Sequence, residues 1–303
     1  MTKWTASDIP SQSGRSAVVT GTGGLGYETA LALADAGCEV IVAGRNPEKG
    51  AAAVAGIRGK APGARVRFEQ LDLASLASVA DFAARLRHER GRLDLLVNNA
   101  GVMTPPKRLE TSDGFELQLG TNYFGHFALT AHLMPLLRAG RDARVVSLSS
   151  VAARGGAINF DDLNAQKSYN PMAAYGQSKL ACLMFALELQ RRAEAAGWPA
   201  ASIAAHPGVS RTELLYNGVG RHSAMGVMRS LLWFLFQPVA QGALPTLYAA
   251  TSPDAKGGAY YGPNRLSETR GYPTAARIPP QALNADVAAR LWELSERYTG
   301  PFR

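Results

Sequence analysis

A tyrosine and a lysine separated by three residues are the most reactive combination in this chain. Tyr175 and Lys179 belong to the segment Tyr175-Gly176-Gln177-Ser178-Lys179. In a helix, residues four apart lie on one face, so the lysine ammonium can approach the phenol and favour its deprotonation. A phenol assisted in this way can act as a general acid or base. Because such pairs also arise by chance on helices, other residues must support this interpretation.

Two further polar segments would complete an acid–base site if they lay beside the tyrosine. Ser149-Ser150 follows one apolar run, and Asn98-Asn99-Ala100-Gly101 closes another. The carboxyl ends of parallel strands meet at one edge of a sheet, where ligands bind in open α/β folds. Side chains alternate along a strand, so the two serines are expected to point to opposite faces.

A glycine-rich segment has the spacing typical of a dinucleotide-binding turn. It reads Val18-Val19-Thr20-Gly21-Thr22-Gly23-Gly24-Leu25-Gly26 and continues into an alanine-rich helical pattern. In G-x-G-x-x-G, Gly21 permits a tight turn, Gly23 a close approach to pyrophosphate, and Gly26 close helix–strand packing. The phosphates would bind at the helix N-terminus, where free N–H groups and the helix dipole favour anions.

The end of the second predicted strand indicates which dinucleotide is bound. A fold that prefers NAD has an acid about 20 residues after the glycine turn to bond the ribose 2′-OH. This strand instead ends in Gly44-Arg45-Asn46. Arg45 can form charge-assisted bonds to a 2′-phosphate, so NADP(H) is expected in preference to NAD(H). The alternative is an exposed arginine that only caps the strand.

Hydrophobic periodicity predicts the elements that position these motifs. Strands are predicted at 17–20, 39–43, 65–69, 93–98, 143–148, 201–205 and 258–261, and helices at 24–36, 48–58, 75–90, 114–137, 175–196, 241–250 and 283–298. This alternation implies an α/β fold, a Rossmann-type doubly wound parallel sheet with helices on both faces. No linker or repeat divides residues 1–303, so a single domain is predicted, with an N-terminal arm at 1–14 and a small substrate lid at 210–238.

The composition is that of a globular chain. The 303 residues are 47% hydrophobic and 18% charged, which excludes collagens, disordered tails and disulfide-stapled miniproteins. Cys38 and Cys182 are expected to be buried free thiols. The net charge is +8, but Lys and Arg are scattered singly, so a charged surface is expected and no nucleic-acid partner. Residues 231–236, the most apolar run, are too short for a transmembrane segment, and a cytoplasmic location is expected. This run can serve as lid, interface or membrane contact.

Together these motifs resemble the short-chain dehydrogenase/reductase family over nearly the whole chain. The matching pieces are the glycine-rich turn, Asp72-Leu73, Asn98-Asn99-Ala100-Gly101, Ser150, Tyr175 with Lys179, and His206-Pro207-Gly208. Within the family the chain is most similar to the branch of retinol dehydrogenases and protochlorophyllide reductases, in residues 44–50, 122–127, 160–164 and 206–212.

The resemblance implies a catalytic set. Tyr175 would give a proton to a carbonyl oxygen, or take one from an alcohol, and Lys179 would assist it. Ser150, which the family pattern selects over Ser149, would hold the substrate oxygen. Asn122 would bind a water that links Lys179 to solvent, although it could instead bond backbone inside its helix. No metal site is expected, and His126, His132 and His206 are interpreted as packing or turn residues.

The resemblance also implies a cofactor-binding set. Asp72 would bond the adenine, although it could instead belong only to the cap of the next helix. Asn98 would support the cofactor-binding end of its strand, and Thr212 would bond the nicotinamide carboxamide. The full set is Gly21, Thr22, Gly23, Gly24, Leu25, Gly26, Arg45, Asp72, Leu73, Asn98, Ala100, Gly101, Tyr175, Lys179, Pro207, Gly208, Val209 and Thr212.

The first turn departs from the family pattern T-G-x-x-x-G-x-G. The turn from Thr20 to Gly26 is one residue shorter, and Gly23 is expected to compensate by letting the backbone cut the corner. The shortening removes loop side chains that could bind a 2′-phosphate, so the preference for NADP depends almost entirely on Arg45.

The implied activity is an NADP(H)-dependent oxidoreductase that transfers a hydride between nicotinamide and a carbonyl or alcohol of a fairly apolar small molecule. Two alternatives stay open: reduction of a conjugated C=C bond, and a nucleotide-sensing protein without turnover. A homo-oligomer formed through the helices at 114–137 and 175–196, which build the dimer interface in relatives, is a further open expectation.

Overall fold

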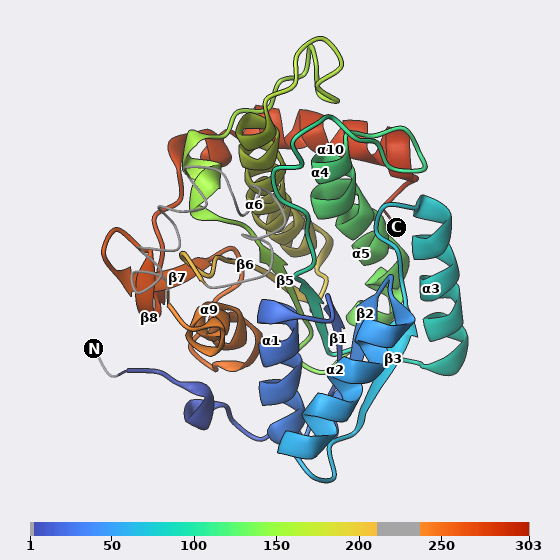
Figure 1. Ribbon diagram of the computed structural model, residues 1–303, viewed down its shortest axis with the longest axis vertical. Coiled ribbons are helices and arrows are strands. Elements are labelled where there is room, and N and C mark those ends of the chain that lie inside the picture. The colour runs from blue at the N-terminus through green and yellow to red at the C-terminus, as the bar shows by residue number, and fades with distance from the viewer. Residues whose placement is uncertain (1–2, 211–236, 303) are drawn as a thin grey trace.

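Residues 3–210 and 237–302 are described by a computed structural model, which places eight strands in one sheet (Figure 1). The strands are β1 (Ser16–Thr20), β2 (Glu39–Gly44), β3 (Val66–Gln70), β4 (Leu95–Asn98), β5 (Arg144–Leu148), β6 (Ala201–Ala205), β7 (Tyr260–Arg265) and β8 (Arg270–Ala275). Their order is β3-β2-β1-β4-β5-β6-β7-β8, and all neighbours are parallel except β7 and β8. The predicted Rossmann-type doubly wound sheet is therefore confirmed.

Helices cover both faces of this sheet (Figure 1). They are α1 (Gly24–Asp35), α2 (Pro47–Lys60), α3 (Leu76–Glu89), α4 (Leu117–Leu119), α5 (Gly125–Arg138), α6 (Pro171–Ala196), α9 (Val239–Thr251) and α10 (Ala285–Thr299), with 3-10 turns η1 (Ala6–Asp8), η3 (Val151–Gly155) and η5 (Pro280–Leu283). One apolar cluster joins α1, α2 and α9 to one sheet face, and a second joins α3, α5, α6 and α10 to the other. Burial of both faces explains why the central strands are apolar throughout rather than alternating.

Asparagine caps determine where two helices begin. Asn46 precedes Pro47, and its side chain accepts a hydrogen bond from the Lys49 amide at 2.7 Å. Asn170 likewise precedes Pro171, which makes α6 begin four residues before the predicted start at 175. An Asn cap followed by proline at the first helical position is a standard helix start. The longer α6 places the tyrosine–lysine pair inside the helix rather than at its end.

The prediction of a seven-stranded, wholly parallel sheet is wrong at one edge. β8 pairs antiparallel with β7, and β7 continues to Arg265 instead of ending at 261. These strands contain Gly271, Pro263 and Pro273. Glycine and proline are unfavourable in strands, so a sequence pattern that contains them is not predicted as a strand. Proline is tolerated here because Pro273 lies in the edge strand β8, and Pro263 lies beyond Tyr261, the last β7 residue that pairs with β6.

The predicted helix at 114–137 is also corrected. Helical structure begins only at Leu117, the first residue of α4, and residues Gly120–Phe124 form a π-helical turn before α5. Gly114 has a φ of +82° and forms a turn, which delays the helix. A Cβ on Gly125 would lie 2.4 Å from the Leu73 carbonyl oxygen, so this segment packs closely on the chain after β3. π-turns are often found at functional sites, and this one contains Asn122.

The C-terminal helix covers part of the two long helices that were candidates for an oligomer interface. Trp292 of α10 packs its ring 4.9 Å from Phe127 of α5 and 5.8 Å from Phe185 of α6, and Phe302 lies 4.6 Å from Trp292. In Figure 1, α10 crosses beside α6 and α5. An interface built on α5 and α6 would therefore have to use the surface that α10 leaves exposed.

The N-terminal arm also packs on the body of the protein. The ring of Trp4 meets Tyr248 of α9 edge to face at 5.3 Å. The backbone N–H of Gln12 donates to the Ala36 carbonyl at 2.8 Å. Of the predicted lid, Ser210 and Gln237 form a parallel bridge, whereas Thr212 and the run 231–236 lie outside the described residues.

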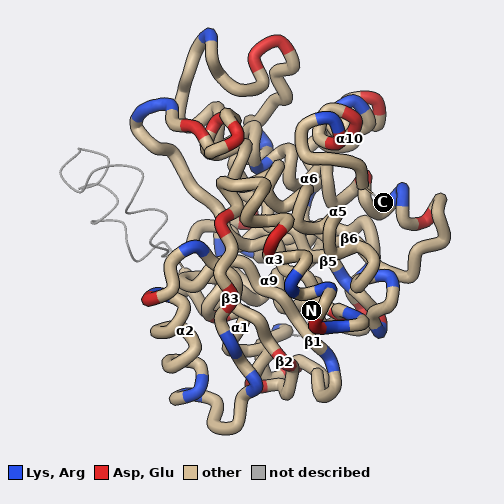
Figure 2. Tube along the Cα trace, turned by 90° about the vertical axis from the view of Figure 1, so that its right-hand side faces the viewer, with Lys and Arg blue, Asp and Glu red and all other residues tan. Residues whose placement is uncertain are grey.

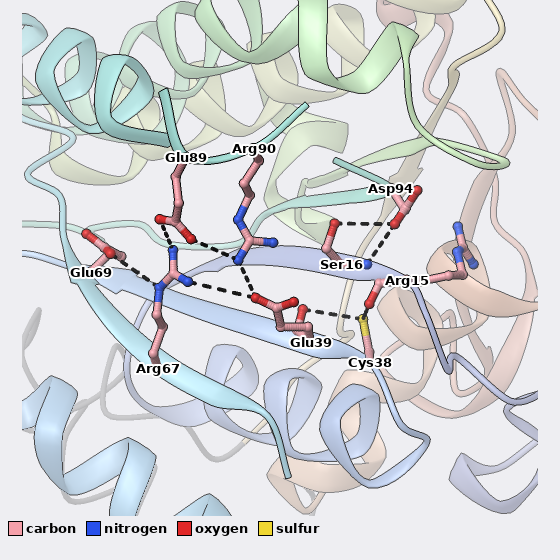
Figure 3. A network of polar contacts seen from close by, with 9 residues as sticks. All are labelled: Arg15, Ser16, Cys38, Glu39, Arg67, Glu69, Glu89, Arg90 and Asp94. Atoms are coloured by element: carbon pink, nitrogen blue, oxygen red, sulfur yellow. Dashed lines mark hydrogen bonds and ion pairs between the residues drawn. The ribbon is translucent and has the colours of Figure 1, made fainter. Parts of the chain in front are cut away.

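An ion-pair network lies at the amino edge of the sheet, opposite the ends that carry the motifs (Figure 3). Arg67 pairs with Glu89 at 2.6 Å and Glu69 at 3.3 Å, and Arg90 pairs with Glu39. Although burial opposes it, these arginines lower the pKa of Glu89. Elsewhere Lys and Arg alternate with Asp and Glu over many elements (Figure 2). No helix within the described ranges is long and apolar enough to span a membrane.

Candidate active site

A cavity of about 570 Å³ runs along the carboxyl ends of β1 to β6. It is lined at one end by the loops after β1, β2 and β3, and at the other by the loops after β5 and β6 and by the start of α6. The sheet order reverses direction between β1 and β4, and this is the point where open α/β folds bind ligands. The cavity therefore connects the predicted nucleotide end with the predicted chemical end.

The glycine-rich turn is bent by Gly21 and Gly24. Their φ angles are +100° and +52°, a region that favours glycine, whereas Gly23 is extended and caps α1. The expectation that Gly23 lets the shortened turn cut the corner is therefore corrected, because the left-handed residues flank it. A Cβ on Gly26 would lie 2.5 Å from the Gly21 carbonyl oxygen, so the expected tight packing at Gly26 is present.

Polar side chains gather at the end of the cavity formed after β2 and β3. Arg45 is exposed and lines this end together with Asn46 and Lys49. The Asp72 carboxylate also lines it and accepts the Ala74 amide at 3.0 Å. Sequence reasoning missed Lys49, although its place four residues after Arg45, in the first turn of α2, is a signal that could have found it.

The turn after β4 is held against the end of β1 by one hydroxyl. Thr20 Oγ1 accepts the amides of Asn99 at 2.9 Å and Ala100 at 3.0 Å and lies 2.9 Å from His126 Nε2. Since His126 Nδ1 lies 2.8 Å from the Asn122 carbonyl, Nδ1 must donate there and Nε2 must accept the Thr20 hydroxyl proton. Burial lowers the pKa of His126 to about 4, helped by the charge of Lys179, so the ring is neutral.

Tyr175, Lys179 and Ser150 line the opposite end of the cavity. Lys179 Nζ donates to the Leu148 carbonyl at 3.0 Å and lies 6.0 Å from the centre of the Tyr175 ring. Ser149 is buried, and its hydroxyl donates to the Lys179 carbonyl at 2.7 Å, whereas the one hydrogen bond of Ser150 Oγ within the described part of the chain is from the Ala152 amide of its own turn. The Ser150 hydroxyl is thus the one with capacity left for a ligand.

Asn122 lies behind this end and does not line the cavity. Its side chain bonds the Val102 amide at 2.7 Å, the Val102 carbonyl at 3.0 Å and the Ser178 hydroxyl at 2.9 Å. The backbone carbonyl oxygen of Asn122 accepts from His126 and from the Cys182 thiol at 3.1 Å. These bonds match the alternative of a backbone-bonding helix residue, and the binding of a relay water by Asn122 stays a prediction.

Most residues of the predicted cofactor set line the one cavity. They are Gly21, Thr22, Gly23, Gly24, Leu25, Arg45, Asp72, Leu73, Ala100, Gly101, Tyr175, Lys179, Pro207, Gly208 and Val209. Gly26 lies beneath the turn, and Asn98 points away to Thr130 at 3.0 Å. Its neighbour Asn99 lines the cavity instead, and its amide nitrogen donates to the Thr20 carbonyl at 2.7 Å. Both cysteines are buried and free, as expected.

Comparison with known proteins agrees with this geometry. A short chain dehydrogenase family model matches residues 15–218. Polyprenol dehydrogenase of Mus musculus is 42% identical over 96% of this chain and 86% of its own, and retinol dehydrogenase 13 of Mus musculus is 42% identical over 95% and 84%. The crystal structure of an uncharacterised protein from Mycobacterium paratuberculosis, 40% identical, superposes with a TM-score of 0.82 and full coverage of both chains. The chain therefore belongs to the short-chain dehydrogenase family, in its retinol dehydrogenase-like branch, and is an oxidoreductase acting on alcohol or carbonyl groups.

Proposed function

We propose that this enzyme transfers a hydride between NADP(H) and the carbonyl or alcohol group of a fairly apolar small molecule. One observation carries the proposal: a single cavity joins the glycine turn and Arg45 to Tyr175, Lys179 and Ser150. Dinucleotide and substrate would therefore meet within one continuous space.

The residues present fit a dinucleotide. The glycine turn leads into the N-terminus of α1, whose free amides suit a pyrophosphate. Apart from its chain neighbours, no atom of residues 3–210 or 237–302 lies within 4 Å of a Cβ built on Gly23, so this face of the turn is open to a ligand. Asp72 and Leu73 would border the adenine, and Pro207 to Val209 the nicotinamide. When bound, the cofactor supplies or accepts the hydride.

The side chains of the chemical end would manage the proton. In the reducing direction, the Tyr175 hydroxyl donates its proton to the substrate oxygen, and the Ser150 hydroxyl donates a hydrogen bond to the same oxygen. Lys179, held by the Leu148 carbonyl, stabilises the resulting tyrosinate by its charge. In the oxidising direction the tyrosinate takes the alcohol proton, so each residue serves both directions.

Preference for NADP(H) is supported by Arg45 and Lys49 at the far end of the cavity. No carboxylate follows β2 at Arg45 to bond a ribose 2′-OH, whereas two cationic side chains line the same place. Arg45→Asp should raise KM for NADPH at least about tenfold, since a charge-assisted bond contributes roughly 1.5–3 kcal/mol. KM for NADH should stay the same or fall. Equal preference for both cofactors in wild type and variant would remove this role.

An apolar substrate is supported by the side chains near the tyrosine. Val102, Met103, Val151 and Met172 line this part of the cavity. Methionine adapts its shape to apolar ligands, so these side chains suit an apolar substrate. The polyprenol and retinol dehydrogenases that resemble this chain are named for long apolar alcohols.

The decisive experiment mixes the enzyme with NADPH and a panel of aldehydes, ketones and enones. Turnover of C=O groups by wild type, reduced at least about 100-fold in Tyr175→Phe with NADPH binding retained, supports the proposal. Hydride delivered to the C=C bond of an enone would make the enzyme a double-bond reductase instead. NADPH binding with no turnover of any substrate would indicate a nucleotide-binding protein. Full activity of Tyr175→Phe would refute the role of the phenol.

A further inference from the structure

Glu268 lies in the turn between β7 and β8, in a strained backbone conformation. Leu266, Ser267 and Glu268 have φ angles of 48°, 55° and 65°, all in the left-handed region that non-glycine residues rarely adopt. Three such residues in succession persist only where surrounding contacts hold them. The contacts of Glu268 show what holds this turn.

The Glu268 carboxylate joins three separate segments. Its Oε2 lies 3.0 Å from His206 Nε2 at the end of β6 and accepts from Arg154 of η3 at 2.7 Å, while its Oε1 accepts the Arg277 amide at 2.9 Å. Arg154 also donates to the Ser267 carbonyl at 3.0 Å. Although burial opposes it, bonds from His206 and the Arg277 amide, with the charge of Arg154, lower the pKa of Glu268 to about 2.

His206 has only one neutral form that satisfies its neighbours. Its ring is fully buried, and Nδ1 accepts the Gly208 amide at 3.3 Å, so the proton must be on Nε2 and must point to Glu268. A Cβ on Gly262 of β7 would collide with Nε2, so the ring has room only because residue 262 is glycine. The carboxylate therefore determines the tautomer that binds the Gly208 amide.

Both loops that meet at Glu268 line the substrate end of the cavity. Ser150 caps η3, Val151 and Ala152 are its first residues, and Pro207, Gly208 and Val209 follow His206. The same β7–β8 turn binds the second loop directly, because the Val209 amide donates to the Thr269 carbonyl at 2.7 Å.

We propose that Glu268 is a positioning residue: its carboxylate sets the spacing between the Ser150 loop and the Pro207–Gly208–Val209 loop, and so the width of the nicotinamide end. This inference rests on the proposed function. Glu268 is not in the cavity lining and acts only through Arg154 and His206. Misplacement of reacting groups by about 1 Å can cost on the order of 100-fold in rate, so a link of this kind affects the reaction without touching it.

Glu268→Gln tests the link at constant size. A carboxylate accepts on both oxygens, whereas an amide accepts on one and donates on the other. At least one of the three donors, from Arg154, His206 or Arg277, must then face an NH₂ group. The matched control is Glu89→Gln, which removes an arginine-paired carboxylate at the amino edge of the sheet, far from the cavity loops (Figure 3).

Binding of two ligands distinguishes an effect at one end of the cavity from an effect at the other. Affinities for NADPH and for adenosine 2′,5′-bisphosphate, which occupies only the adenosine end, are measured by isothermal titration. In Glu268→Gln we expect NADPH to bind about tenfold more weakly and the bisphosphate to bind as in wild type, with kcat for a carbonyl substrate reduced about tenfold or more. Glu89→Gln should leave all three values unchanged.

The outcomes are distinct. Unchanged NADPH binding and kcat in Glu268→Gln, or equal weakening of both ligands, would overturn the inference while leaving the proposed function intact. If wild type itself bound neither ligand, the proposed function would fail, and this inference with it.

Discussion

The buried Thr20 hydroxyl should be worth several kcal/mol to the fold, and Thr20→Val measures this with little change of shape. Thr20 is fully buried in β1, where valine suits a strand. The substitution removes the acceptor of the Ala100 amide and the hydrogen-bond partner of His126 Nε2. The Asn99 amide keeps its second acceptor, the Val97 carbonyl at 3.0 Å.

Two groups are then left without a partner in Thr20→Val. A buried polar group that loses its partner costs about 1–3 kcal/mol, so the free energy of unfolding should fall by about 3 kcal/mol. Thr29→Val is the matched control, because Thr29 is equally buried and its hydroxyl has no partner among the described residues. Thr29→Val should change the free energy of unfolding by no more than about 0.5 kcal/mol, or raise it slightly.

Urea unfolding at pH 7.5, followed by far-UV circular dichroism, gives both values from the midpoint at constant slope. The reasoning is refuted if Thr20→Val lies within about 0.5 kcal/mol of wild type, or if Thr29→Val is as destabilising as Thr20→Val. Either result would mean that the hydroxyl pairing in this chain does not determine the stability of the turn after β4.

Three further measurements follow from buried groups. The pKa of His126 is lowered from 6.5 to about 4, so unfolding is favoured as pH falls below 6.5. The free energy of unfolding of wild type should therefore fall by about 2 kcal/mol between pH 7.5 and 5, and that of His126→Gln by markedly less. Equal losses would contradict this. Trp292→Ala should cost about 3–5 kcal/mol in urea unfolding, against a negligible cost for the exposed Leu283→Ala. Burial raises the pKa of Cys38 to about 12 and also raises that of Cys182, so both thiols should react with Ellman's reagent only on unfolding, and rapid labelling of the native protein would disagree.

Much of the candidate site could be predicted because its signals are local. The glycine turn, Arg45 and the tyrosine–lysine pair each depend on residues a few positions apart, and the parallel sheet brings them to one edge. Asn98 shows the limit of this reasoning. Strand alternation decides whether Asn98 or its neighbour faces the cavity, and a one-residue difference reverses the answer.

By itself the sequence determined the α/β class, the succession of the strands along the chain up to β7 and the chemistry at the strand ends, because periodicity and turn residues act over short distances. The tertiary structure decided what depends on distant partners. Asn122 in the π-turn bonds Val102 and Ser178, α10 covers part of α5 and α6 through Trp292, and Glu268 reaches His206 across 62 residues of chain. Such contacts have no sequence pattern, since each exists only after the sheet has brought its partners together.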